Sequence, residues 1–446
     1  MRTARSVTMS VRRSSRVNTF GKQLTVLITG SVASQIILFL SAPVIARMFS
    51  PTDYGVFTFY SSMISILSMI TGGKYEIAIV LPDSDEEAAN VMGLSMLSVL
   101  AVTGFAAVLF AFFGEWFMGM FGADSDPLWL IWIPIGMLAV GWYQSCNYWS
   151  TRKKTFKRQS ISQILRSTTV SGIQLSTGFS GIHAVGLILG QLGGQVIATS
   201  ALMYQTWKED GKMILSQLRW AKIKAASIRY KQFPLFNMPQ TFLNALSNQM
   251  APFLLAMYYG SAVVGFYGVS LRLLQQPITI ISQSVRQVYL KRASEVHNKG
   301  QRLFPVFMKT TAALFAIGIV PTLIIMIWGP ELFKLLLGEK WGLAGEYARW
   351  MVLWLFFAYL NPPASVTAQV LERQKSMLVF EVFLFSARWL SLWLGYELGD
   401  NMTSIICFSL TGALFQLIYI AGIGAMCFRS RMPQVEIADQ YPESRS

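Results

Sequence analysis

Long apolar runs recur from one end of this chain to the other, and they constrain its fold more than any other feature. A helix that crosses a bilayer needs about 20 mostly apolar residues, and roughly twelve runs in the sequence meet that requirement. The runs are 23–46, 54–72, 88–113, 127–149, 160–180, 182–206, 234–259, 261–288, 303–328, 346–369, 377–397 and 401–428. Because 53% of the residues are hydrophobic and only 13% are charged, the composition is that of a membrane protein. The sequence predicts an all-α polytopic membrane protein with about 12 transmembrane helices.

The net charge of +15 is distributed unevenly along these runs. Basic residues gather in the segment before the first run and in the connections that follow each even-numbered run, whereas acidic residues dominate the remaining connections. The positive-inside rule therefore places both termini in the cytoplasm and the protein in the cytoplasmic (inner) membrane. Residues 1–22 become a basic cytoplasmic arm and 429–446 a cytoplasmic tail. Since no soluble domain accompanies the arm, we expect no nucleic-acid partner.

The chain divides near its middle into two similar halves. Pro43 followed by Gly55 in the first half resembles Pro252 followed by Gly265 in the second. The longest cytoplasmic connection, 207–233, separates an N-lobe at 23–206 from a C-lobe at 234–428, and we expect six helices in each. Two pseudo-symmetric lobes of this kind are typical of transporters that bind their cargo between the repeats.

Cysteine and histidine usage argues against catalytic and metal sites. The three cysteines lie in or near apolar runs, and the two histidines lie near loops. No spacing matches a metal-ligand set or a disulfide framework. We therefore expect no cofactor, no metal and no enzymatic activity.

Several predicted spans carry polar stripes. Residues three or four apart share one face of a helix, and polar groups that face hydrocarbon cost several kcal/mol each. Two adjacent spans present amide-rich faces, for which we favour the lining of a cavity: Asn237, Gln240, Asn244 and Asn248, then Gln276 and Gln283. A serine-rich face at 160–174 fits helix packing and cavity lining equally well.

Three arginines fall deep within predicted spans. Arg166, Arg272 and Arg388 are costly there unless water, an acid or an anionic ligand compensates them. We favour a cavity role for Arg272, and for Arg166 and Arg388 structural pairing stays an equal alternative. Other cations lie nearer span ends, where long side chains reach the interface: Arg286, Lys309 and Arg349. Cations that face a wet cavity select anions, and a guanidinium suits phosphate.

Short motifs in both halves carry a family resemblance. The stretch from Ala42-Pro43 through Arg47 to Ser50-Pro51-Thr52-Asp53-Tyr54-Gly55 resembles the N-terminal hairpin of O-antigen-type polysaccharide repeat-unit flippases, members of the MOP exporter superfamily. Residues 74–82, from Lys74 to Pro82, resemble the next motif of that group. Later matches follow in the same order: Gly265-Phe266-Tyr267 leading to Arg272 and Pro277, Gly329-Pro330-Glu331-Leu332-Phe333, Leu337-Gly338, Lys340-Trp341 and Leu371-Glu372-Arg373-Gln374.

The resemblance implies a V-shaped pair of six-helix lobes that flips polyprenyl-diphosphate-linked oligosaccharide outward by alternating access, for O-antigen, capsule or exopolysaccharide synthesis. The partners it implies are that glycolipid, membrane lipid and other polysaccharide assembly proteins. Within it, Arg47 becomes a further candidate cavity cation, and Lys74 and Glu76 become candidate functional residues. Anchoring of helix ends is an equal alternative for these three.

Two other functions stay open at this point. A cation-coupled drug or metabolite antiporter of the same superfamily would be expected to use acids within its spans, and only Glu381 occupies such a position. An integral-membrane polysaccharide polymerase or acyltransferase would need a large outer loop or a histidine deep in a span, and the sequence offers neither.

Overall fold

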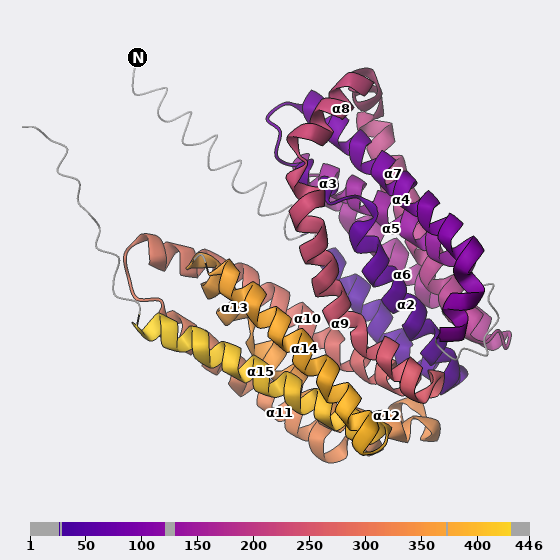
Figure 1. The fold of residues 1–446 in the computed structure, drawn as a ribbon, viewed down its shortest axis with the longest axis vertical. Coiled ribbons are helices and arrows are strands. Elements are labelled where there is room, and N and C mark those ends of the chain that lie inside the picture. The colour runs from indigo at the N-terminus through magenta and orange to yellow at the C-terminus, as the bar shows by residue number, and fades with distance from the viewer. Residues whose placement is uncertain (1–25, 27–28, 121–129, 372, 430–446) are drawn as a thin grey trace, which may run out of the picture. The chain divides into compact units, whose positions relative to one another are not determined.

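The computed structural model describes residues 26, 29–120, 130–371 and 373–429. These residues form helices joined by short connections, with no strand among them (Figure 1). The prediction of an all-α fold is confirmed. The predicted arm at 1–22 and all of the predicted tail except Arg429 lie outside the described residues.

The described helices fall into two compact units. The first contains residues up to Val269 together with Lys334–Trp341, and the second contains Ser270–Phe333 and the residues from Gly342 onward. The first unit holds a helix at Thr29–Met48 and then these elements: α2 Pro51–Thr71, α3 Tyr75–Ala78, α4 Asp85–Met120, α5 Trp132–Arg152, α6 Phe156–Phe179, α7 Ala184–Gln217, α8 Trp220–Arg229, the π-helix η2 Phe233–Asn237, α9 Met238–Tyr259, the start of α10 Ser261–Asn298 and the 3-10 helix η3 Glu339–Trp341. The second holds the rest of α10, α11 Phe304–Leu337 except its last turn, α12 Gly342–Leu360, α13 Pro362–Val370, α14 Gln374–Leu398 and α15 Asn401–Arg429.

Long helices occupy the predicted spans. Seven described stretches are both long and apolar enough to cross a membrane: Thr29–Met48, Pro51–Thr71, Asp85–Gly114, Ala184–Gln217, Phe304–Leu337, Glu339–Val370 and Asn401–Arg429. The five remaining predicted spans coincide with α5, α6, α9, α10 and α14, which have 21 to 38 residues each. At 1.5 Å per residue these helices are also long enough to cross the hydrocarbon core of about 30 Å.

The start of α2 explains the sequence motif around Pro51. The Ser50 hydroxyl accepts a hydrogen bond from the Asp53 amide, and the Asp53 carboxylate accepts one from the Ser50 amide, which makes a capping box ahead of Pro51. The other Asp53 oxygen accepts from the Ala184 amide at 2.9 Å, so the same carboxylate joins the starts of α2 and α7. Much of this motif therefore serves the fold of the first unit.

Glycines let α2 and the start of α10 touch backbone to backbone. A Cβ added at Gly55 would lie 1.8 Å from the Ser261 carbonyl oxygen, and one at Gly265 would lie 1.8 Å from that of Pro51. Side chains larger than hydrogen are therefore excluded from both positions. The two glycines that suggested an internal repeat meet at one helix crossing within the first unit.

Candidate functional site

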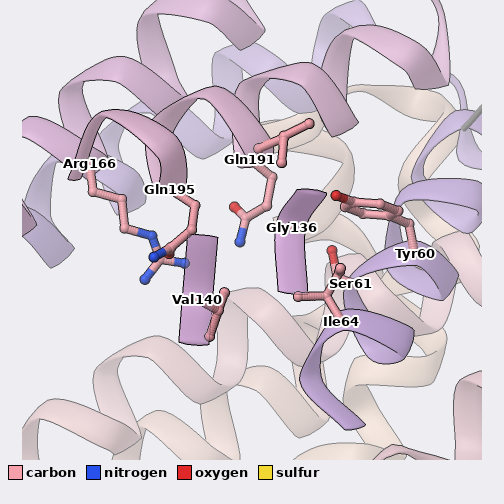
Figure 2. A pocket seen from close by; sticks show the side chains of 9 residues that line it. Tyr60, Ser61, Ile64, Gly136, Val140, Arg166, Gln191 and Gln195 are labelled. Carbon is pink, nitrogen blue, oxygen red and sulfur yellow. The ribbon is translucent and has the colours of Figure 1, made fainter. Parts of the chain in front are cut away.

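A small pocket lies among four helices of the first unit (Figure 2). It encloses about 60 Å³ and is lined from α2, α5, α6 and α7. Its lining residues are Tyr60, Ser61, Ile64, Gly136, Val140, Arg166, Gln191, Leu192 and Gln195. Figure 2 shows the Arg166 and Gln195 side chains converging on the pocket from α6 and α7, with Gln191 beside them. Of the deep arginines predicted from the sequence, Arg166 thus lines a pocket.

Close packing of α6 on α7 brings these polar groups together. A Cβ added at Gly194 would lie 2.3 Å from Val170 Cγ2 and 2.9 Å from the Arg166 carbonyl oxygen, and one at Gly190 would lie 2.4 Å from Gln174 Cγ. Small residues spaced four apart commonly allow such close helix pairs in membranes. Because Gln191 and Gln195 each follow one of these glycines, the same spacing stacks both amides along the pocket.

The hydroxyl groups of the pocket come from α2. The Tyr60 hydroxyl donates a hydrogen bond to the Trp132 carbonyl oxygen at 3.5 Å. The Ser61 hydroxyl is buried and has no hydrogen-bond partner among the described residues. On α7, the Gln195 amide donates to the Thr199 hydroxyl at 3.4 Å. The lining combines one cation with neutral polar groups, and none of the nine residues is acidic.

Sequence reasoning missed the α7 glutamines and the α2 hydroxyls. The signal was present in residues 190–195, Gly-Gln-Leu-Gly-Gly-Gln, where two Gly-Gln pairs are spaced four apart. Read as one pattern, it combines a helix-packing face with an adjacent amide face. Tyr60 and Ser61 lie in a mostly apolar helix and carry no comparable signal.

The serine-rich face of α6 packs against other helices. The Ser171 hydroxyl lies 2.8 Å from that of Ser41, and the Gln174 amide donates to the Leu187 carbonyl oxygen at 3.0 Å. Ser160 and Ser167 are also buried. Of the two interpretations offered for this stripe, these contacts favour helix packing.

Arg388 lies in a different environment, within the second unit. Its residue exposure is 4%, and its guanidinium carbon lies 5.2 Å from the centre of the Trp354 ring and 5.3 Å from that of Phe408. A cation between aromatic faces without bulk water is stabilised by cation–π attraction of about 2 kcal/mol or more. These contacts favour a packing role, and the cavity role of Arg388 stays a prediction.

The amide stripe of α9 is left uncovered by the packing of that helix. α9 packs on α2 through Gln249, whose side chain bonds the Ser62 and Ser65 hydroxyls. Asn237, the last residue of η2, is half-buried. The stripe residues within α9 are exposed: Gln240, Asn244 and Asn248. The Asn248 amide donates to the Asn244 side-chain oxygen at 3.1 Å. These amides do not glue α9 to α2, which removes the packing explanation for that pair of helices.

The stripe of α10 has mixed exposure. Arg272 and Gln276 are half-buried, and the Gln276 side-chain oxygen is buried with no hydrogen-bond partner among the described residues. Gln283 is exposed. Arg286 is also exposed and donates to the Ser365 hydroxyl at 3.2 Å. The cavity role of Arg272, Gln276 and Gln283 stays a prediction.

Arg47 takes part in a reciprocal set of bonds at helix ends. Its guanidinium donates to the carbonyl oxygens of Leu335 and Leu336 at 2.8 and 3.1 Å. In return, the Lys340 ammonium donates to the carbonyl oxygens of Arg47 and Phe49. Cations stabilise the carbonyl ends of helices. Arg47 therefore has the contacts of a helix-end anchor, and its predicted role as a cavity cation is untested.

Lys74 and Glu76 form a buried pair between α2 and α4. Their exposures are 8% and 7%, and the Lys74 ammonium lies 3.7 Å from one Glu76 oxygen. The other Glu76 oxygen has no hydrogen-bond partner among the described residues. Lys74 has φ of 61°, in the left-handed region that disfavours side chains larger than glycine's. Burial raises the pKa of the Glu76 carboxyl, although Lys74 partly opposes the shift.

Helical bundles that carry amides and arginines within their long apolar helices are typical of multi-pass membrane transporters. Solved structures share this fold. The fold resembles that of a multidrug resistance MATE family transporter of the MOP superfamily in an inward-facing conformation, with a TM-score of 0.71 and 13% identity over 90% of this chain and 98% of that chain. It also resembles the lipid II flippase MurJ in an inward closed conformation, with a TM-score of 0.70 and 13% identity over 90% of this chain and 91% of that chain. The protein therefore has the fold of MOP superfamily transporters.

The family follows from the sequence comparison. The chain belongs to the polysaccharide biosynthesis protein family, whose pattern matches residues 44–344. A stretch of 139 residues is 22% identical to the amylovoran biosynthesis protein AmsL of Erwinia amylovora and covers 31% of this chain. The match spans 35% of that relative, about a third of its length.

Proposed function

We propose that this protein flips polyprenyl-diphosphate-linked oligosaccharide repeat units from the inner to the outer leaflet of the cytoplasmic membrane by alternating access. Its family acts in polysaccharide biosynthesis, and a structural relative is a lipid II flippase. A charged, sugared head group cannot cross hydrocarbon unaided, because its polar groups would lose their hydration without compensation. A protein surface that replaces this hydration solves the problem while the lipid tail stays in the bilayer.

The exposed amide stripe of α9 is the observation that carries the proposal. Asn244 and Asn248 bond to each other, and both residues stay exposed. Facing lipid would cost several kcal/mol for each amide. Amide side chains that face a wet cavity donate to and accept from sugar hydroxyls, which suits a neutral oligosaccharide surface. Arg272 of α10 and Arg166 of the pocket supply positive charge for an anionic cargo.

The predicted orientation gives the direction of transport. On this proposal cargo enters from the inner leaflet, and an inside-negative potential favours outward movement of an anion by about 2.3 kcal/mol per charge per 100 mV. On this proposal the glycolipid and membrane lipid are the direct partners, and other polysaccharide assembly proteins act on the delivered unit.

The test removes the amide pair in cells. In a strain that lacks the gene, the wild-type protein restores surface polysaccharide. The double variant Asn244→Leu with Asn248→Leu should lower surface polysaccharide about tenfold or more, because it loses two polar contacts of roughly 1 kcal/mol each. Replacing both partners leaves neither amide unpaired, so the membrane level of the variant should match that of the wild type. Gln301→Leu likewise replaces a side-chain amide by leucine, at an exposed loop position, and should have no effect.

The leaflet in which lipid-linked precursor accumulates separates this proposal from the alternatives. Loss of a flippase leaves the precursor on the inner leaflet, where an added, membrane-impermeant glycosidase cannot reach it in intact cells. Loss of a polymerase leaves single units on the outer leaflet, open to that enzyme. Loss of an unrelated antiporter leaves no precursor in excess. Accumulation on the outer leaflet, or none at all, would refute the proposed function.

A further inference from the structure

The pocket beside Arg166 is too small for a sugar chain but large enough for one functional group. Pockets that enclose whole small-molecule ligands measure about 300–1,000 Å³, whereas this pocket encloses about 60 Å³. A cavity needs roughly 10–15 Å³ of this kind of volume for each water molecule, so a few water-sized groups fit. A single carboxylate or phosphate group has that size.

The chemistry of the lining selects an anion. Arg166 brings a permanent positive charge and a planar fork of donors, which matches the paired oxygens of a carboxylate or phosphate. Gln191 and Gln195 add amide groups from the facing helix. None of the lining residues is acidic, so no lining carboxylate repels an incoming anion.

A second observation points to a missing partner. The Ser61 hydroxyl at the pocket is buried and bonds no other described residue. Leaving a buried polar group unsatisfied is unfavourable, and a ligand oxygen within reach would satisfy it. The neighbouring serine, Ser62, instead donates to the Gln249 side chain at 3.1 Å. The two adjacent hydroxyls of α2 thus differ, since one serves helix packing and the other is available at the pocket.

We infer that the pocket formed by Arg166, Gln191, Gln195 and the α2 hydroxyls is a subsite for one carboxylate or phosphate group of the transported glycolipid. The inference rests on the proposed function, since it assigns a part of the cargo to a part of the first unit. Two sources supply the shared chemistry: an acidic sugar or acidic substituent in the repeat unit, or the diphosphate that joins the glycan to the lipid. The pocket would fix the position of the cargo, while the exposed amides contact its hydroxyls.

Binding of small probes tests the subsite without any transport. Purified full-length protein in lipid nanodiscs is titrated with glucuronate, with methyl phosphate and with neutral glucose. We expect the two anions to bind and to raise the unfolding temperature, and glucose to do neither. Arg166→Gln should weaken the anion affinity about tenfold or more, because a charge-assisted contact contributes roughly 1.5–3 kcal/mol. Gln191→Leu should weaken it less. Lys309→Gln removes an exposed cation within α11 and should leave the affinity unchanged.

Arg166→Lys and a folding measurement keep the result interpretable. Each variant is first checked for a monodisperse elution profile and for its own unfolding temperature without ligand. Arg166→Lys keeps the charge and loses the fork, so it should bind with intermediate affinity. If folded Arg166→Gln and Gln191→Leu proteins bind both anions as the wild type does, the subsite is refuted.

Transport of two cargoes identifies the source of the anionic group. Cells supplied with an acidic and a neutral repeat unit on the same lipid carrier receive wild-type or Arg166→Gln protein. If the sugar carboxylate occupies the pocket, the variant loses the acidic cargo and keeps the neutral one. If the diphosphate occupies it, the variant loses both. A variant that moves both cargoes like the wild type refutes the subsite alone, whereas a wild-type protein that moves neither refutes the proposed function.

Discussion

Arg166 and Arg388 occupy similar positions in the sequence, deep within predicted spans, but their surroundings in the structure differ. Each lies deep in a long helix, α6 in the first unit and α14 in the second. Arg166 is half-buried beside a polar pocket with space for a small group. Arg388 is 4% exposed and stacked on two aromatic rings. An arginine within a membrane helix is thus not a functional signal by itself, because its neighbours decide whether the charge faces a ligand or the core.

The facing helices create this difference. Gly190 and Gly194 of α7 let this helix pack closely on α6. Gln191 and Gln195 therefore line the same pocket as the Arg166 guanidinium. Opposite α14, α12 and α15 instead present the aromatic rings of Trp354 and Phe408 to Arg388. A Cβ added at Gly412 of α15 would lie 3.2 Å from Trp354 Cβ and 3.5 Å from an Arg388 nitrogen, so the ring and the guanidinium both pack closely on this helix. Arg166 therefore lies beside a pocket because its neighbours are polar and leave space, whereas Arg388 lies in the core because aromatic rings pack against it.

Truncation of Arg388 should have the largest effect on stability. Arg388→Ala removes the cation–π contacts and leaves a cavity beside Trp354, so we expect unfolding to become easier by about 2–5 kcal/mol. The unfolding temperature in detergent and the membrane level both measure this loss. Arg166→Ala, at the pocket, should lower either quantity far less. If Arg388→Ala is as stable as the wild type and yet fails in transport, Arg388 belongs to the cavity and the contrast with Arg166 is wrong.

A methyl group added at Gly194 should disrupt the pocket and lower the stability of the fold moderately. Gly194→Ala places a methyl group against Val170 and the Arg166 backbone, and overpacking of this kind costs about 1–3 kcal/mol. Since α6 must move away, we expect anion affinity and transport to fall together with the unfolding temperature. Gly172→Ala is the matched control, because an added Cβ there meets no atom within 4 Å. That control should be neutral or slightly stabilising, by up to about 1 kcal/mol. Equal stability of the two variants would contradict the close α6–α7 packing.

The long helices could be predicted from the sequence, but only part of the candidate site could. Apolar runs located the long helices because bilayer thickness sets their length, and the amides of α9 were found because hydrocarbon penalises them whatever their neighbours. The environment of Arg388 could not be predicted, since Trp354 and Phe408 are distant in sequence and tertiary packing alone brings them together. The contacts of Arg47 could not be predicted either. Its bonds to the Leu335 and Leu336 carbonyls depend on a contact nearly 300 residues away in the chain.

The Lys74–Glu76 pair is a third kind of buried charge, because each member has an oppositely charged partner close by in the chain. Burial raises the pKa of Glu76 above its ordinary 4.5, so the folded state binds this proton more tightly than the unfolded state does. The associated stability is therefore fully present below about pH 4 and is lost as pH rises through the unfolded value toward the raised folded value. Lys74 is the charged neighbour that acts on Glu76.

Replacing both members of the pair should remove this pH dependence with the smallest change in stability. The double variant Lys74→Met with Glu76→Gln should be about 0–2 kcal/mol more stable than the wild type near pH 7, since buried ion pairs are often no better than neutral side chains. Lys74→Met alone should be less stable, because it leaves a buried carboxylate without its cation. The measurement is the unfolding temperature of the three proteins between about pH 4 and pH 7. If the double variant is less stable than the wild type at every pH, the pair stabilises the fold as the Arg388 stack does. If it is stable but inactive in transport, Lys74 and Glu76 act in the mechanism together with Arg166.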